Sequence, residues 1–369
     1  MNEALSNLAD DFFKNSLDSS PTSAIMRGYK EYFDQIEELT ETRFDQNLKD
    51  LDKFEKRLKE INFDNLSNKE KVTYGMLEYA FGSNKDSLLD KSWEFGAGVS
   101  GFTGYLIDYN QQMFIPDLES ADLLLKRLEL YNQFFNQVSS VQKKGLNENR
   151  VATERNLLRT IDQIESYLKT SLEEDPLLLV NFSPEVSEQD VSSWKNKAKL
   201  IIESHVRPRV NSYLEQLKSE HLPKGRSDTN PGIMWIDGGD DIYLRSLRKF
   251  TGNKDITVKE VHETGLSEIK RLKKEFFEIG KNVFADVTTP EEVIYKMQTE
   301  PSMRFESKEQ MLQMAEDIIK RAYEPLSDWF TVFPKAPCNV LPVPEESEKH
   351  APPAYYYSPL PDGSRDGTY

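Results

Sequence analysis

The fold class is indicated by a stretch that reads FDQNLKDLDKFEKRLKEI, from Phe44 to Ile61. Its apolar residues recur three or four positions apart, with charged residues between them: Phe44, Leu48, Leu51, Phe54, Leu58 and Ile61. This spacing places the apolar side chains on one face of an α-helix. The stretch therefore predicts an amphipathic helix that packs against other helices.

Helical patterns continue along most of the chain. The apolar spacing returns in Leu124–Val138, and Gly145, just after two lysines, is the expected stop of that helix. Pro208 interrupts a third pattern and should kink or split it, because proline lacks an N–H. Capping boxes mark helix starts, since a Ser or Thr accepts a backbone N–H and the residue three positions later returns a bond. They are predicted at Ser67/Glu70, Thr257/Glu260, Thr289/Glu292 and Ser307/Gln310.

The C-terminal region breaks this rhythm. Eight prolines after Val332 exclude long helices, and the runs Cys338–Val343 and Ala354–Tyr357 are suited to short strands. We therefore predict a mainly α fold, a multi-helix fold that forms a cleft, with a small C-terminal β hairpin or edge strand. The predicted parts are an N-terminal helical subdomain at 1–222, a connection rich in Gly and Pro at 223–242, and a helical plus β part at 243–369 that is incomplete at its C-terminus.

Composition restricts the classes of function. The 369 residues include 47 basic and 63 acidic side chains, a net charge of −16 that disfavours nucleic acid and anionic membrane surfaces as partners. The 20 Phe, 16 Tyr and 4 Trp are too many for a disordered acidic chain. Cys338 is the only cysteine, so no internal disulfide can form. These features, with an acidic N-terminus unlike a signal peptide, predict a cytoplasmic protein.

Several motifs resemble chemical sites without completing them. Gly96–Gly101 has the glycine spacing of a dinucleotide loop, but no β-branched strand precedes it, and a loop over aromatic residues is the simpler interpretation. The acidic cluster Asp237–Asp241 lacks the distal Glu of a calcium loop, so we expect a turn before a helix capped by Asp240 or Asp241. His262–Leu266 begins like a zinc-peptidase motif, but position 266 is Leu rather than the second His ligand.

Two neighbouring segments carry a family resemblance. The run Ala354-Tyr355-Tyr356-Tyr357 and the turn Asp362-Gly363-Ser364-Arg365 resemble the bacterial family known as domain of unknown function 885 (DUF885), in which such segments precede a zinc motif of the His-Glu-x-x-Pro-Gly-His-His type. The resemblance is strong over residues 231–369 and also includes Pro21–Gly28.

The resemblance implies a mostly helical zinc metallopeptidase of the gluzincin kind, a hydrolase that holds a peptide substrate along an edge strand. Ala354, Tyr355 and Tyr356 are then the candidate substrate contacts, and β-augmentation is the mode of binding. No catalytic residue and no metal ligand can be assigned in this chain, so zinc would be a cofactor of the complete protein. We expect this chain to be the front part of a longer protein. The oligomeric state is left open.

Two alternatives remain at this point. Each Tyr of the run could instead pack its ring on a helix within a hairpin. The whole chain could instead be a non-catalytic helical scaffold that binds a protein partner through its acidic surface.

We predict that this chain, expressed as it stands, is inactive as a peptidase and binds zinc only substoichiometrically. A catalytic zinc site needs three protein ligands, and the four His residues form no pair with ligand spacing. Elemental analysis of the purified chain tests this, and tight one-to-one zinc would contradict it.

Overall fold

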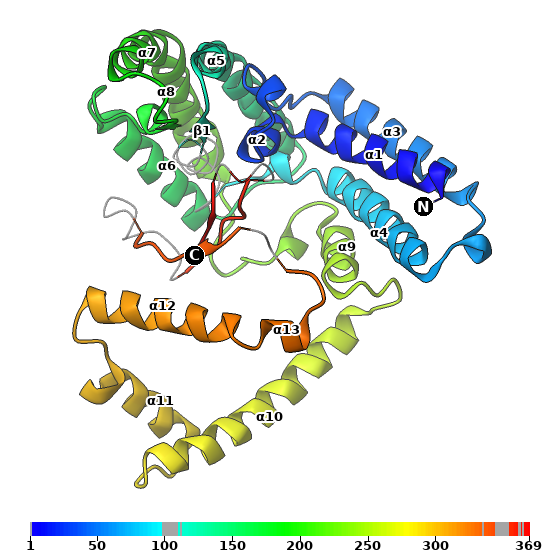
Figure 1. Cartoon of the computed structure of the whole chain (residues 1–369), viewed down its shortest axis with the longest axis vertical. Coiled ribbons are helices and arrows are strands. Elements are labelled where there is room, and N and C mark those ends of the chain that lie inside the picture. Colours follow the sequence, from blue (N-terminus) through cyan, green and yellow to red (C-terminus); the bar gives the residue numbers. More distant parts are fainter. Residues whose placement is uncertain are drawn as a thin grey trace. The chain divides into compact units, whose positions relative to one another are not determined.

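The protein is represented by a computed structural model, which describes residues 2–97, 110, 113–333, 336–343, 354–360, 363 and 365–369. The chain forms two compact units, Met1–Ile256 and Thr257–Tyr369. Helices dominate both units, so the predicted mainly α fold is confirmed (Figure 1). Among the described residues, none of the helices has the length and apolarity that crossing a bilayer requires.

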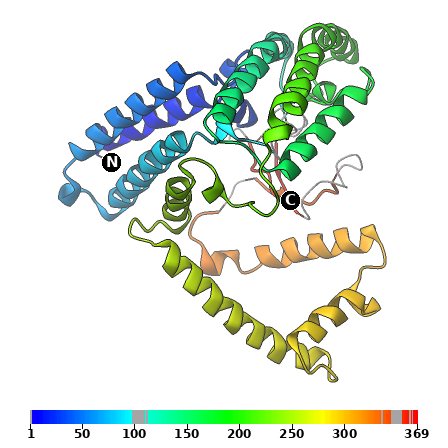
Figure 2. The same cartoon turned by 180° about the vertical axis from the view of Figure 1, so that it is seen from behind.

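The first helical cluster of unit 1 is made by three long helices. They are α1 (Glu3–Ser19), α3 (Glu41–Lys59) and α4 (Asn68–Asp90), drawn side by side in blue and cyan in Figures 1 and 2. Within α3, the predicted apolar face is confirmed, because Leu51, Phe54 and Leu58 are buried. They pack with Leu5 and Leu8 of α1 and with Leu77 and Phe81 of α4. The capping box at Ser67 and Glu70 starts α4 as predicted.

A larger cluster surrounds α5 (Leu118–Asn147). Its other members are α6 (Glu154–Lys169), α7 (Glu188–Ile201) and α8 (Arg207–Gln216), and its core holds Tyr131, Phe134 and Phe135 of α5. Two π-helical turns flank α8, η7 (Ile202–Val206) and η8 (Leu217–His221). Pro208 stands near the start of α8, directly after η7. The predicted interruption at this proline is therefore a π-helical turn.

The prediction that Gly145 stops its helix is wrong. It does not stop α5, which continues to Asn147, but lies buried inside the helix. A Cβ atom at this position would overlap the carbonyl oxygen of Glu94, in the short helix η3 (Ser92–Glu94). Glycine is needed here because the backbone of η3 lies directly against α5.

The remaining elements of unit 1 are short apart from α9 (Gly239–Thr251). They are α2 (Pro21–Met26), the helices η1 (Lys30–Tyr32), η2 (Phe63–Asn65), η6 (Pro176–Leu178), η9 (Leu222–Lys224) and η10 (Ile233–Trp235), and the parallel strands β1 (Phe114–Ile115) and β2 (Asn181–Phe182).

The start of α9 differs from the prediction. Its N-cap is Gly238, at φ 73°, and Asp240 and Asp241 lie inside the first turn rather than at the cap. There they stabilise the positive end of the helix dipole. The helix belongs to unit 1, because Arg245 pairs with Asp90 at the end of α4. The compact unit that contains α9 ends at Ile256.

Unit 2 consists of helices followed by a small sheet. The helices are α10 (Val258–Val283), α11 (Pro290–Thr299), η11 (Pro301–Met303), α12 (Lys308–Tyr323) and α13 (Leu326–Trp329), and the strands are β3 (Cys338–Asn339) and β4 (Gly367–Thr368). The capping boxes that start α10 and α11 are complete as predicted. At α12, Ser307 caps the helix, but the Gln310 side chain accepts from the backbone N–H of Glu306 instead of Ser307.

A buried ion pair between Arg207 and Asp175 links α8 to the residue that precedes η6. Arg207 donates from Nε and Nη2 to Oδ2 of Asp175, at 3.0 and 2.8 Å, and the Asp175 side chain is fully buried. Its other oxygen accepts the backbone N–H of Leu177 at 3.0 Å. Burial raises the pKa of the Asp175 carboxyl above its ordinary value, although both donors act to lower it.

We predict opposite effects for two Gly→Ala substitutions. Gly145→Ala should destabilise the protein by about 1–3 kcal/mol, because the methyl group would overlap the Glu94 carbonyl. Gly75→Ala in α4 meets no atom within 4 Å and should stabilise it by roughly 1 kcal/mol through helix propensity. Urea unfolding followed by circular dichroism measures the stability of both variants. Equal effects would refute the close contact between η3 and α5 at Gly145.

We also predict that Arg207→Met costs about 3–5 kcal/mol, since it leaves a buried carboxylate without its partner. Without the guanidinium, the pKa of Asp175 should rise further. A carboxyl whose pKa is higher in the folded state stabilises the fold at low pH, and this stabilisation disappears as pH rises through the folded pKa. The loss should therefore be smaller at pH 4 than at pH 7.

Two variants control this experiment. Asp175→Asn combined with Arg207→Met keeps an acceptor for Leu177 and removes the charge, so it should recover most of the stability lost at pH 7. Arg155→Met breaks an exposed pair with Asp228 and should cost less than about 1 kcal/mol. If Arg207→Met lowers the free energy of unfolding equally at pH 4 and pH 7, the loss does not come from a buried Asp175 carboxylate without its partner.

Candidate functional site

The small sheet of unit 2 contains the predicted substrate-binding segment. Strand β4 pairs in parallel with β3, with Gly367 opposite Cys338 and Thr368 opposite Asn339. On its other side, Thr368 forms an antiparallel bridge with Tyr357, and the two residues exchange hydrogen bonds of 2.7 and 2.9 Å. The strand β4 is therefore central, and the segment that ends at Tyr357, which we call the outer strand, is joined to it, among the described residues, by this single bridge.

The outer strand has an open edge at Tyr356. In an antiparallel pair, a residue that exchanges both hydrogen bonds is flanked by residues whose N–H and C=O groups point the other way. Since Tyr357 bonds to Thr368, the main-chain groups of Tyr356 point away from β4. Within the part of the chain that the structure describes, no hydrogen bond to the main chain of Tyr356 is found. This edge can accept another extended chain.

The tyrosines lie on both faces of this strand. The rings of Tyr355 and Tyr357 are 5.2 Å apart in an edge-to-face arrangement, so these two side chains share one face. The Tyr356 side chain lies on the other face, where its hydroxyl group is against Gly367, and it is 54% exposed. Ala354 is exposed as well. The candidate residues Ala354, Tyr355 and Tyr356 therefore lie together on one strand.

The turn after the strand is held by side chains as well as backbone. Arg365 donates from Nη2 to the carbonyl of Ser358 at 3.2 Å, and burial lowers the pKa of its guanidinium. Gly363 has φ 79°, a left-handed conformation that favours glycine. The Asp-Gly-Ser-Arg motif thus acts here, through its glycine and arginine, to hold the strand in place; Asp362 and Ser364 lie outside the described residues, as do Pro352 and Pro353.

One contact of the sheet was missed by the sequence analysis. The Asn339 side chain donates to the Asp366 carboxylate at 3.1 Å and so joins β3 to the turn before β4. The two residues are 27 positions apart in the chain, so no local pattern would have revealed the pair.

The histidines do not form a zinc site in the described residues. His205 is exposed in η7, His262 is exposed in α10, and His221 is buried in η8, where Nδ1 lies 3.4 Å from the Gln216 carbonyl. His350 lies outside the described residues. No group of three or more His, Cys, Asp or Glu side chains is placed to hold a metal within those residues. The donor set that the structure describes therefore does not fit a zinc ion.

The other sequence motifs have structural partners or lie partly outside the described residues. Asp237 accepts from Asn149 at 3.0 Å through its side chain and from Arg150 at 2.7 Å through its carbonyl. Arg150 also forms a buried ion pair with Glu94 at 2.7 Å, so this cluster joins α4, η3 and α9. Of Gly96–Gly101, the residues from 98 onward are outside the described part.

Comparisons with known structures identify the fold. A putative lipoprotein from Colwellia psychrerythraea superposes with a TM-score of 0.81 at 18% identity, over 99% of this chain and 66% of that one. A putative lipoprotein of unknown function from Shewanella oneidensis gives a TM-score of 0.63 at 16% identity, over 99% of this chain and 64% of that one. This chain thus spans about two thirds of their length. The comparison with curated proteins finds no match. The model of the family described as bacterial protein of unknown function (DUF885) matches residues 21–369, and the chain belongs to this family.

Proposed function

We propose that this chain forms the substrate-binding part of a zinc metallopeptidase-like hydrolase that cleaves peptide bonds. The observation that carries the proposal is the open main-chain edge at Tyr356, on the outer strand of the small sheet. A peptide laid along this edge would gain hydrogen bonds that do not depend on its sequence, which suits a site that must hold many peptides.

The side chains on this strand fit an extended peptide. The small side chain of Ala354 would let the substrate backbone approach closely. The exposed Tyr356 ring offers apolar area, and its hydroxyl, or that of Tyr355, could donate to a substrate carbonyl or to the oxyanion that develops during hydrolysis. The described residues supply the binding surface only. The zinc ligands and the general base would come from polypeptide other than this chain.

The compartment is part of the proposal. The single cysteine favours a reducing cytoplasm, whereas both structural neighbours are described as putative lipoproteins, a description that favours the cell envelope for this protein. Fractionation of cells that express the complete protein distinguishes the two locations.

We predict that Tyr356→Pro in the complete protein impairs peptide hydrolysis while leaving the fold intact. Proline removes the outward N–H of the edge, and the bonds between Tyr357 and Thr368 remain. For a fluorogenic peptide, kcat/KM should fall roughly tenfold, as expected for the loss of about one good hydrogen bond. The matched control, Tyr357→Pro, removes the N–H that binds Thr368 and should lower the melting temperature instead.

The hydroxyl groups are tested by Tyr355→Phe and Tyr356→Phe. If one of them donates to the oxyanion, its variant should lose about 100- to 1000-fold in turnover with little change in melting temperature. Turnover within about threefold of wild type in both Phe variants, together with unchanged kcat/KM in Tyr356→Pro, would assign the run to packing alone. A complete protein that hydrolyses no peptide would favour the protein-binding scaffold.

A further inference from the structure

The helices of unit 2 have apolar faces that the other described residues of unit 2 do not cover. Along α10, apolar side chains recur every three to seven positions on one side of the helix, and each is at least half exposed: Leu266, Ile269, Leu272, Ile279 and Val283. Charged side chains occupy another side, where Arg271 pairs with Glu268 and Glu275 at 2.7 Å. The helix is therefore amphipathic; α11 packs against it at Gly280 through Val293, and the rest of its apolar side is exposed.

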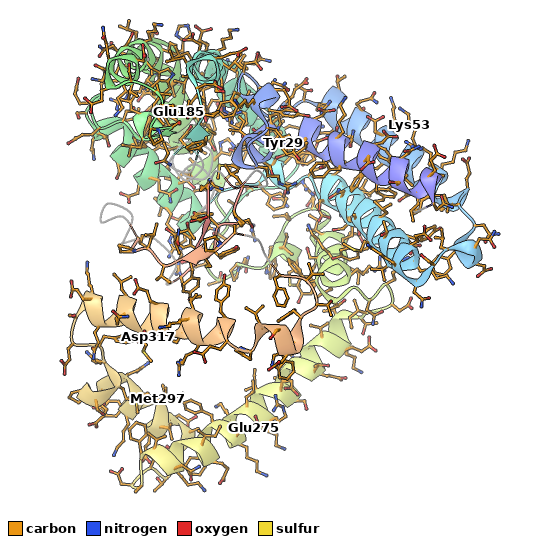
Figure 3. The ribbon with its side chains drawn as sticks, in the orientation of Figure 1. Tyr29, Lys53, Glu185, Glu275, Met297 and Asp317 are labelled. Atoms are coloured by element: carbon orange, nitrogen blue, oxygen red, sulfur yellow. The ribbon has the colours of Figure 1, made fainter. Side chains whose placement is uncertain are left out.

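Apolar side chains are also exposed on α11, on α12 and on the segment after them. In α12, Met311, Met314 and Ile318 are each close to half exposed, and no residue of this helix is buried. Trp329 at the end of α13 is 80% exposed. Figure 3 shows the side chains along these helices, with Glu275, Met297 and Asp317 labelled. Met297 of α11 is exposed too.

Unit 2 buries far fewer apolar side chains than unit 1. The two hydrophobic clusters of the described residues, around α5 and around α3 and α4, both lie in unit 1. In unit 2 the buried apolar side chains of the described residues are Val287, Val293 and Leu360. Amphipathic helices gain most of their stability by packing, and contiguous exposed apolar patches of this extent mark a surface that binds something. Unit 2 therefore has apolar faces but little core of its own.

The length of the structural neighbours indicates the occupant. The Colwellia neighbour superposes on 99% of this chain, yet a third of its own length has no counterpart here. That third is about half the length of this chain, which is enough for a set of packed helices. We propose that the remaining third of the DUF885 fold packs on the apolar faces of α10 and α12. On docking, its helices would complete the core of unit 2.

The test measures the accessibility of single cysteines. In a Cys338→Ser background, Leu272→Cys on α10 and Ile318→Cys on α12 are made one at a time, with Phe250→Cys in α9, where Phe250 is 85% exposed, as the control. Each is made in this chain and in the product of the complete reading frame. In this chain, all three thiols should react with maleimide at similar rates. In the longer product, positions 272 and 318 should react at least tenfold more slowly and position 250 should not change.

Four results would overturn the proposal. One is equal reactivity in the two products, and another is a reading frame that supplies no further polypeptide. Protection in this chain that increases with protein concentration would identify a second copy as the occupant, and sedimentation would then show dimers. Protection in this chain at every concentration would mean that unit 1 covers the faces.

Discussion

An amphipathic helix is stable in water only when its apolar face is covered, and this requirement governs both units of the structure. In unit 1 it is met by α5, whose thirty residues provide a long surface on which α7 and α8 pack. Three aromatic residues of α5, Tyr131, Phe134 and Phe135, fill the centre of that cluster. In unit 2 the same kind of helix lacks such a centre. The contrast explains why the two units, built from similar sequence patterns, differ so much in burial.

Local patterns predicted the helices well because their physical cause is local. A capping box depends on a Ser or Thr and a residue three positions later, and the pairs beginning at Ser67, Thr257 and Thr289 all form as expected. The apolar period of α3 is likewise a property of neighbouring residues. The errors arose where a distant partner decides the outcome. Gly145 resembles a helix stop in sequence, but the backbone at Glu94, about fifty residues earlier, sets its role.

The candidate site shows the same division. The short strands followed from the prolines and the apolar runs, and Tyr357 does join a sheet. The order of the strands did not follow, because a parallel partner for β4 comes from Cys338, far along the chain. Which edge of the small sheet is open depends on that order. The sequence therefore indicated the segment, of which the structure bridges Tyr357 to β4, whereas the direction of the Tyr356 main chain required the structure.

The two π-helical turns that flank α8 have a consequence for how this region tolerates insertions and deletions. A π-helical turn holds one residue more than an α-helical turn, and each residue advances an α-helix by about 100°. Deleting one residue from η7 would let the turn become α-helical, while α8 kept its own sequence. Because the change in length is confined to η7, α8 keeps its orientation and Arg207 still pairs with Asp175. We therefore expect η7 to be a place where chain length can change by one residue without altering which side chains of α8 are buried.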